Sequence, residues 1–188
     1  VVVDPTLLLD SDRWERISTN IEDKDYIFCY FLGDNKMARE MANAVKNKTG
    51  KKIFSIPCMD EINLEDLKFG DKQLYDVGPS EFLSYIKNAA YVITDSFHGT
   101  VFSVLFNKQF VVYNRYNNKN KNSTNSRIDT LLLKIELENR RVLNNCSTEE
   151  SVNILLGAID YSKVNFKVSE LKSESIEYLK CVLKECDK

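Results

Sequence analysis

Along the first two thirds of the chain, the apolar residues are arranged in two kinds of segment. Short apolar runs with the length of a β-strand occupy residues 26–32, 52–56, 73–77, 90–93 and 109–113. Between them, apolar residues recur at three- and four-residue spacing, as at Met37, Met41 and Val45, which is the period of an amphipathic helix. We therefore expect an α/β fold: a Rossmann-like, three-layer α/β/α domain with a mostly parallel sheet of about five strands.

Turn and capping residues mark where these helices begin and end. Asp34 or Asn35 suits the N-cap of a helix that Gly50 ends. Gly78 and the proline after it open another helix, because proline in a first turn loses nothing by lacking an N–H. Residues 147–150, Ser-Thr-Glu-Glu, form a capping box and predict a further helix start.

The C-terminal segment has a different character. Residues 161–188 are charged and contain neither glycine nor proline, so we expect them to be mostly helical. The residues expected to pack this helix are Leu171, Ile176, Leu179 and Leu183. We divide the chain accordingly into a domain at residues 1–160 and a helical extension at residues 161–188. The extension would pack on the domain or reach toward a part of the protein outside this sequence.

The composition narrows the class of protein. The 188 residues suit one domain, and 43% of them are hydrophobic, which is enough for a substantial core. A formal net charge of −2 argues against a nucleic-acid-binding surface, so we expect no nucleic-acid partner. No stretch approaches the ~18–20 apolar residues that cross a bilayer, and no signal peptide is visible, so we expect no transmembrane segment. The chain opens inside an apolar run without an initiator methionine, and we expect it to be a piece of a longer protein.

The five cysteines are odd in number and lack the spacing of a metal or redox motif. Cys29 and Cys58 lie in apolar runs, which favours buried free thiols in a reducing compartment. We therefore expect a cytoplasmic protein. One histidine and scattered cysteines do not readily supply the ligands of a metal site, so we expect no metal and no cofactor.

The strongest candidate site lies at residues 95–100, which contain the single histidine of the chain, His98. An apolar strand precedes this segment and a helical pattern follows it. In an open α/β sheet, ligands bind where strands end, and a helix start offers unpaired N–H groups to an anion. We therefore take as candidate ligand-binding residues Ser96, Phe97, His98, Gly99 and Thr100. His98 could instead be a capping or core histidine, and Asp95, which would repel an anion, is expected to support the site.

Two further places could contribute polar groups. Gly78, Ser80 and Glu81 lie at an earlier strand-to-helix junction, which can border the same cleft in a doubly wound sheet. Glu81 equally suits the dipole of its own helix. Arg127 starts a helix after a polar loop and could grip a phosphate or carboxylate, although a solvated or ion-paired arginine has the same pattern.

Several segments of the chain resemble the polysaccharide pyruvyl transferases. The likeness is carried by residues 78–83, 86–89, 91–103 and 106–110, and by Asp4-Pro5-Thr6-Leu7-Leu8 near the start. Residues 126–132 and 137–140 also look like the downstream segment of this family. The order and spacing of these segments are together specific, and the likeness covers about residues 1–180.

The resemblance implies a two-domain enzyme of GT-B type, of which this chain is the C-terminal, donor-binding half. Family members move pyruvate from phosphoenolpyruvate to sugar hydroxyls and so form a pyruvate ketal on exopolysaccharide, capsule or cell-wall glycans. By this analogy His98 would be the catalytic residue. His98, Gly99 and Thr100 would hold the donor's phosphate or carboxylate, and Arg127 would add charge. The acceptor would be a glycan or a lipid-linked sugar, and the protein would be cytoplasmic or peripheral at the inner face of the membrane.

The resemblance also implies that part of the catalytic set lies elsewhere. The residues that grip the acceptor would belong to an N-terminal domain absent from this sequence, and this chain alone would be inactive or nearly so. Two other functions stay open. One is a GT-B glycosyltransferase domain that binds a nucleotide-sugar near residues 78–81. The other is a non-catalytic domain that binds an anion or a glycan.

Overall fold

The computed structural model describes residues 2–58, 66–115, 125–143 and 145–186. Its sheet has five strands, which pair in parallel in the order β3-β2-β1-β4-β5. The strands are β1 (Ile27–Tyr30), β2 (Ile53–Ile56), β3 (Lys72–Gln73), β4 (Tyr91–Thr94) and β5 (Gln109–Val112). The predicted Rossmann-like α/β fold is confirmed, although β3 is shorter than the apolar run at 73–77 suggested.

Helices separate most of these strands along the chain, and further helices follow β5. They are α1 (Ser11–Ile17), α2 (Lys36–Thr49), α3 (Pro79–Asn88), α4 (Phe97–Leu105), α5 (Asn125–Lys134), α6 (Thr148–Leu156) and α7 (Tyr161–Cys186), with short 3-10 turns η1 (Pro5–Leu8), η2 (Asp66–Lys68) and η3 (Glu138–Arg140). The chain adds β2 and β3 on one side of β1 and then returns to add β4 and β5 on the other side. This reversal between β1 and β4 is where an open α/β sheet leaves a crevice at the carboxyl ends of its strands.

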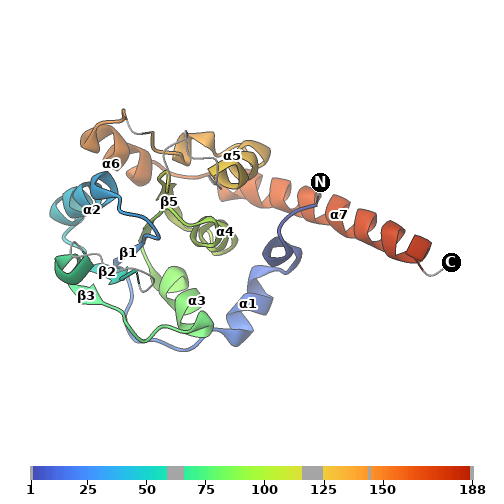
Figure 1. Cartoon of the computed structure of the whole chain (residues 1–188), viewed down its shortest axis with the longest axis horizontal. Helices are drawn as coiled ribbons and strands as arrows, with labels where there is room; N and C mark the ends of the chain where they lie inside the picture. The colour runs from blue at the N-terminus through green and yellow to red at the C-terminus, as the bar shows by residue number, and fades with distance from the viewer. Residues whose placement is uncertain (1, 59–65, 116–124, 144, 187–188) are drawn as a thin grey trace.

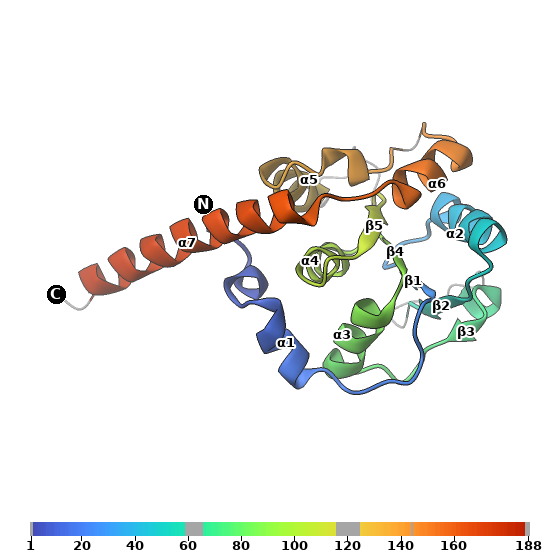
Figure 2. The same cartoon turned by 180° about the vertical axis from the view of Figure 1, so that it is seen from behind.

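Helices lie on both faces of the sheet (Figures 1 and 2). Helices α2 and α6 cover one face, where Ile27 and Cys29 of β1 are buried. Helices α3, α4 and α5 cover the other face, where Phe28 is buried. Successive strand residues point to opposite faces. A strand buried on both faces is therefore apolar throughout, which explains the continuous runs in the sequence.

Local signals set the helix ends as predicted. The Asn35 side chain accepts a hydrogen bond of 3.0 Å from the Ala38 amide at the start of α2. Gly50 ends that helix in the left-handed region, with φ of 72°. Ser147 and Glu150 form the reciprocal bonds of a capping box at the start of α6.

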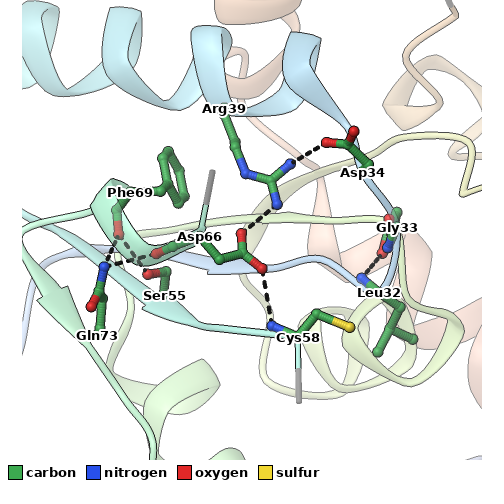
Figure 3. Close-up of polar contacts among 10 residues, drawn as sticks. Leu32, Gly33, Asp34, Arg39, Ser55, Cys58, Asp66, Phe69 and Gln73 are labelled. Atoms are coloured by element: carbon green, nitrogen blue, oxygen red, sulfur yellow. Dashed lines mark hydrogen bonds and ion pairs between the residues drawn. The ribbon is translucent and has the colours of Figure 1, made fainter. Parts of the chain in front are cut away.

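A buried ion pair ties α2 to η2 (Figure 3). Arg39 is 6% exposed and its guanidinium is paired with the carboxylate of Asp66, which is 7% exposed. Asp66 also accepts a hydrogen bond of 3.0 Å from the Cys58 amide. Residues 60–71 are acidic and follow no regular hydrophobic period, so the sequence predicts a loop over the surface there. That expectation is wrong for Asp66, because its carboxylate is buried and paired with Arg39. Residues 60–65 lie outside the described ranges.

Helix α7 runs along the N-terminal segment and extends beyond the rest of the domain (Figures 1 and 2). The Val3 amide donates to the Ser175 hydroxyl at 3.1 Å, and Leu171 packs against the core. The expectation that Leu183 also packs is wrong, since it is 64% exposed at the projecting end. Within the described part of the chain, no helix combines the length and the apolar character needed to cross a membrane.

Candidate functional site

The junction of β4 and α4 is built on Ser96. Its hydroxyl accepts from the Gly99 amide at 3.3 Å, and its carbonyl accepts from both the amide and the hydroxyl of Thr100 at 3.0 Å and 2.9 Å. Ser96 is therefore the N-cap of α4. The amides of Phe97 and His98, in the first turn, lie outside the bonding pattern of the helix itself. They are the N–H groups that a helix start can offer to an anion.

Gly99 brings α4 against the end of β4. A Cβ at this position would lie 2.7 Å from the Thr94 hydroxyl oxygen, which is closer than side chains approach. That hydroxyl is itself engaged, because it donates to the Tyr30 carbonyl at 2.6 Å and accepts from the Ser96 amide at 3.0 Å. Gly99 and Thr100, two of the predicted site residues, are both buried. Gly99 lies against Thr94, and the Thr100 hydroxyl is bonded to the Ser96 carbonyl.

Asp95 points away from α4 toward the turn that follows β1. Its carboxylate accepts from the amides of Leu32 and Gly33 at 2.7 Å and 3.0 Å, and the residue is 2% exposed. Burial raises the pKa of the Asp95 carboxyl above its ordinary value. Asp95 therefore joins the end of β4 to the turn after β1, and its expected role in supporting the site stays a prediction.

His98 lies on the rim of the site with a carboxylate beside it. Its side chain is 53% exposed, and its Nε2 atom lies 3.9 Å from an oxygen of Asp4. The second oxygen of Asp4 lies 2.8 Å from the Arg127 guanidinium, whose central carbon is 4.1 Å from the centroid of the Phe97 ring. The fold thus gathers Phe97, His98 and Arg127 around Asp4.

The pKa of the Asp4 carboxyl lies below its ordinary value. Burial by itself would raise this pKa, but the hydrogen bonds from Thr6 and the charges of His98 and Arg127 outweigh the effect of burial. Sequence reasoning placed Asp4 only within a family-like segment and gave it no role. Its one local signal is its position before Pro5, and its ionic partner Arg127 is 123 positions away.

A pocket of about 470 Å³ opens at the carboxyl ends of β1, β2 and β4. His98 and Ser96 supply polar groups to it, and Gly78 borders it at the start of α3. Much of the wall is aromatic and comes from Trp14, Tyr30, Phe82 and Phe102. Both strand-to-helix junctions, at Gly78 and at Ser96, therefore border this pocket.

Ser80 and Glu81 are not among the residues that line this pocket. The Glu81 carboxylate accepts from the Thr19 hydroxyl at 2.8 Å and from the Ser80 hydroxyl at 3.1 Å. These bonds, with that from Thr19 the strongest, hold the pKa of Glu81 below its ordinary value. Of the three residues proposed at this junction, the structure brings Gly78 to the pocket and turns Glu81 toward its own helix start.

Arg127 and Phe97 border a second pocket of about 350 Å³ between η1, α5 and α7. Asp4 lines this second pocket, and His98 lines the first. The predicted site residues therefore divide between two neighbouring hollows, with the Asp4 and His98 side chains between them. Among the described residues, no group of three or more His, Cys, Asp and Glu side chains is placed to hold a metal ion.

Comparison with known proteins agrees with the resemblance read from the motifs. A family model described as polysaccharide pyruvyl transferase matches residues 1–118, which include all five strands and His98. A search of curated proteins finds no match. Because the family model covers more than half of the 188 residues, the chain belongs to the polysaccharide pyruvyl transferase family.

Proposed function

We propose that this chain is the donor-binding half of an enzyme that transfers pyruvate from phosphoenolpyruvate to two hydroxyls of a sugar. The observation that carries the proposal is His98 in the first turn of α4, on the rim of the pocket at the carboxyl ends of the strands. Membership of the family supports the reaction class.

The reaction makes definite demands on the site. Two sugar oxygens bond to the central carbon of the donor, the bond from that carbon to the phosphate oxygen breaks, and inorganic phosphate leaves. Of the two hydroxyl protons, one goes to the methylene carbon, which becomes a methyl group, and the other leaves with the phosphate. The donor carries a phosphate and a carboxylate, which a helix start and an imidazole can hold. In our proposal, the His98 ring and the first amides of α4 bind one of these anions. The apolar wall of the pocket then faces the methylene group.

The acceptor in this proposal is a glycan or a lipid-linked sugar. It would be held opposite the pocket by an N-terminal half of GT-B type that lies outside this sequence. This chain alone would bind the donor without turning it over. Synthesis of an exopolysaccharide, capsule or cell-wall polymer would place the enzyme in the cytoplasm, free or at the inner face of the membrane.

Calorimetric titration with phosphoenolpyruvate tests the donor site, on this chain and on the full-length protein. His98→Ala removes one charge-assisted contact and should weaken donor binding by about 1.5–3 kcal/mol. Glu81→Gln is the matched control, because the Glu81 carboxylate is bonded to Thr19 and Ser80 and should not affect the donor. Unchanged donor affinity in His98→Ala would remove the basis of the proposal.

The size of the pocket favours one alternative, a glycosyltransferase that binds a nucleotide-sugar. A volume of about 470 Å³ with aromatic walls exceeds what a three-carbon donor fills. A nucleotide that competes with phosphoenolpyruvate, or binds where phosphoenolpyruvate does not, would favour this alternative.

A further inference from the structure

Asp4 is placed between the two cationic side chains of the candidate site. One carboxylate oxygen is 2.8 Å from the Arg127 guanidinium, and the other is 3.9 Å from Nε2 of His98. The Asp4 side chain is 13% exposed, whereas those of His98 and Arg127 are each about half exposed. A carboxylate that is mostly shielded from water interacts more strongly with neighbouring charges than one on the open surface.

The surroundings of Asp4 hold its carboxylate in place. The amide and the hydroxyl of Thr6 donate to it at 3.1 Å and 2.7 Å, so Asp4 caps η1. Leu7, in the same turn, is 3% exposed in the core. The preceding amide, that of Val3, is bonded to Ser175 of α7. These contacts restrain the position of the Asp4 carboxylate, so it can orient a neighbouring side chain.

His98 needs such an orienting group. Its ring packs edge-on against Phe97, with 5.5 Å between the ring centroids, and the Asp4 carboxylate lies beside it. A distance of 3.9 Å is longer than a hydrogen bond. Catalytic hydrogen bonds are often long without substrate and tighten when it binds. An imidazole oriented by a carboxylate on one nitrogen presents its other nitrogen to the ligand.

We propose that Asp4 is a positioning residue for His98, and that Arg127 anchors Asp4 over the Phe97 ring. The role of His98 in the donor site rests on the function proposed above. Arg127 then acts through Asp4 and does not contact the donor, in keeping with its place in the second pocket. The positive charge that the family resemblance assigned to donor binding is used instead to hold the orienting carboxylate.

The single histidine makes the contact directly measurable, without reference to any activity. The ring resonances of His98 in an NMR spectrum should move in Asp4→Asn and in Arg127→Gln. Asp10→Asn is the matched control: it removes the same charge from the same segment, where Asp10 pairs with Lys172. The proposal is overturned if Asp4→Asn leaves the ring resonances where Asp10→Asn leaves them.

Steady-state kinetics of the full-length protein with phosphoenolpyruvate test the positioning role. Asp4→Asn should lower kcat by about 10–100-fold, by analogy with the loss of a group that orients a metal-ligating histidine. KM should change by less than about threefold, because the donor contacts remain. Asp4→Glu, which keeps the charge, should recover part of kcat, and Asp10→Asn should retain it. Full kcat in a folded Asp4→Asn protein would refute the role.

The NMR comparison and the kinetic measurement distinguish a failure of the proposed function from a failure of the role proposed for Asp4. If the unmodified protein does not use phosphoenolpyruvate, the proposed function fails, and the NMR comparison still decides whether Asp4 orients His98. If Asp4→Asn does not fold, as circular dichroism would show, Arg127→Gln and Asp4→Glu carry both measurements. Arg127→Gln is then expected to shift the ring resonances and lower kcat, and an unchanged value of either contradicts the proposal.

Discussion

Arg39 and Asp66 form a buried ion pair, which contributes little net stability when intact but should destabilise the domain strongly when one partner is removed. The Arg39 guanidinium carbon lies 5.3 Å from the centroid of the Phe31 ring and 5.7 Å from that of Phe69, and among the residues that the structure describes its Nε atom has no hydrogen-bond partner. Desolvation of two charges offsets much of their attraction. The loss of one partner is more damaging than the net strength of the pair suggests, because it leaves the other charge buried alone.

Asp66→Asn should therefore lower the free energy of unfolding by about 3–5 kcal/mol, since Arg39 stays buried and loses the buried carboxylate that it is paired with. The measurement is urea denaturation followed by circular dichroism. Asp34→Asn is the control, because Asp34 is 3.6 Å from the same guanidinium but its side chain is 76% exposed. Its effect should stay within about 0.5 kcal/mol. Equal effects of the two substitutions would show that burial does not govern the pair.

Residue-level signals were only partly sufficient to find the candidate site. His98 and Ser96 could be placed from the sequence, since a strand end followed by a helix start is a local pattern. For Glu81 the sequence left two readings open, its own helix start or a ligand contact, and the structure shows bonds to Ser80 and to Thr19 in a distant segment. Asp4 was out of reach, since its ionic partner Arg127 belongs to the other end of the domain.

At the scale of elements, the approach of α4 to β4 depends on the absence of one side chain. The first turn of α4 can lie against Thr94 because Gly99 has no Cβ. The same approach places His98 at the rim of the pocket. The spacing of strand and helix therefore sets both the stability of the junction and the position of the candidate site.

Gly99→Ala should destabilise the protein by about 1–3 kcal/mol, the usual effect of overpacking a close contact. Thermal or urea unfolding measures this change. Gly157→Ala is the comparison: Gly157 has φ of −66°, and its nearest neighbours would lie 3.4 Å from an added Cβ. That substitution should change stability by less than about 0.5 kcal/mol. A neutral Gly99→Ala would mean that α4 can move away from β4 freely.

Helix α7 combines a packed beginning with an exposed end. Val164 is 3% exposed near its start, whereas Leu183 is 64% exposed near its end. Val164→Ala should lower the free energy of unfolding of this chain by about 2 kcal/mol, through lost burial and the cavity left behind. Leu183→Ser should change it by less than about 0.5 kcal/mol. A large loss in Leu183→Ser would indicate that this end of α7 is covered in solution.

At the scale of the whole molecule, β1 is central in the sheet and reports on global unfolding. Cys29 of β1 is 0% exposed, between β2 and β4, and burial raises the pKa of its thiol. Cys181, near the end of α7, is exposed. A thiol reagent reacts with the thiolate and needs access to it. The two cysteines should therefore differ greatly in reactivity.

In a variant that retains only Cys29, labelling at neutral pH should proceed through unfolding of the whole domain and should speed up with urea. A variant that retains only Cys181 should react rapidly without denaturant. The measurement is the rate at which a chromogenic thiol reagent reacts with the protein and releases its coloured product. Similar rates for the two variants would contradict a rigid, buried β1.

The sequence by itself determined the kind and order of most elements, the parallel sheet and the junction that carries His98. These properties follow from local causes, namely hydrophobic period, capping residues and glycine or proline at helix ends. Only the tertiary structure decided that Asp66 is buried, that Leu183 is exposed, and that Asp4 lies between Arg127 and His98. These contacts join residues far apart in the chain, and they exist because the sheet order and helix packing bring the segments together.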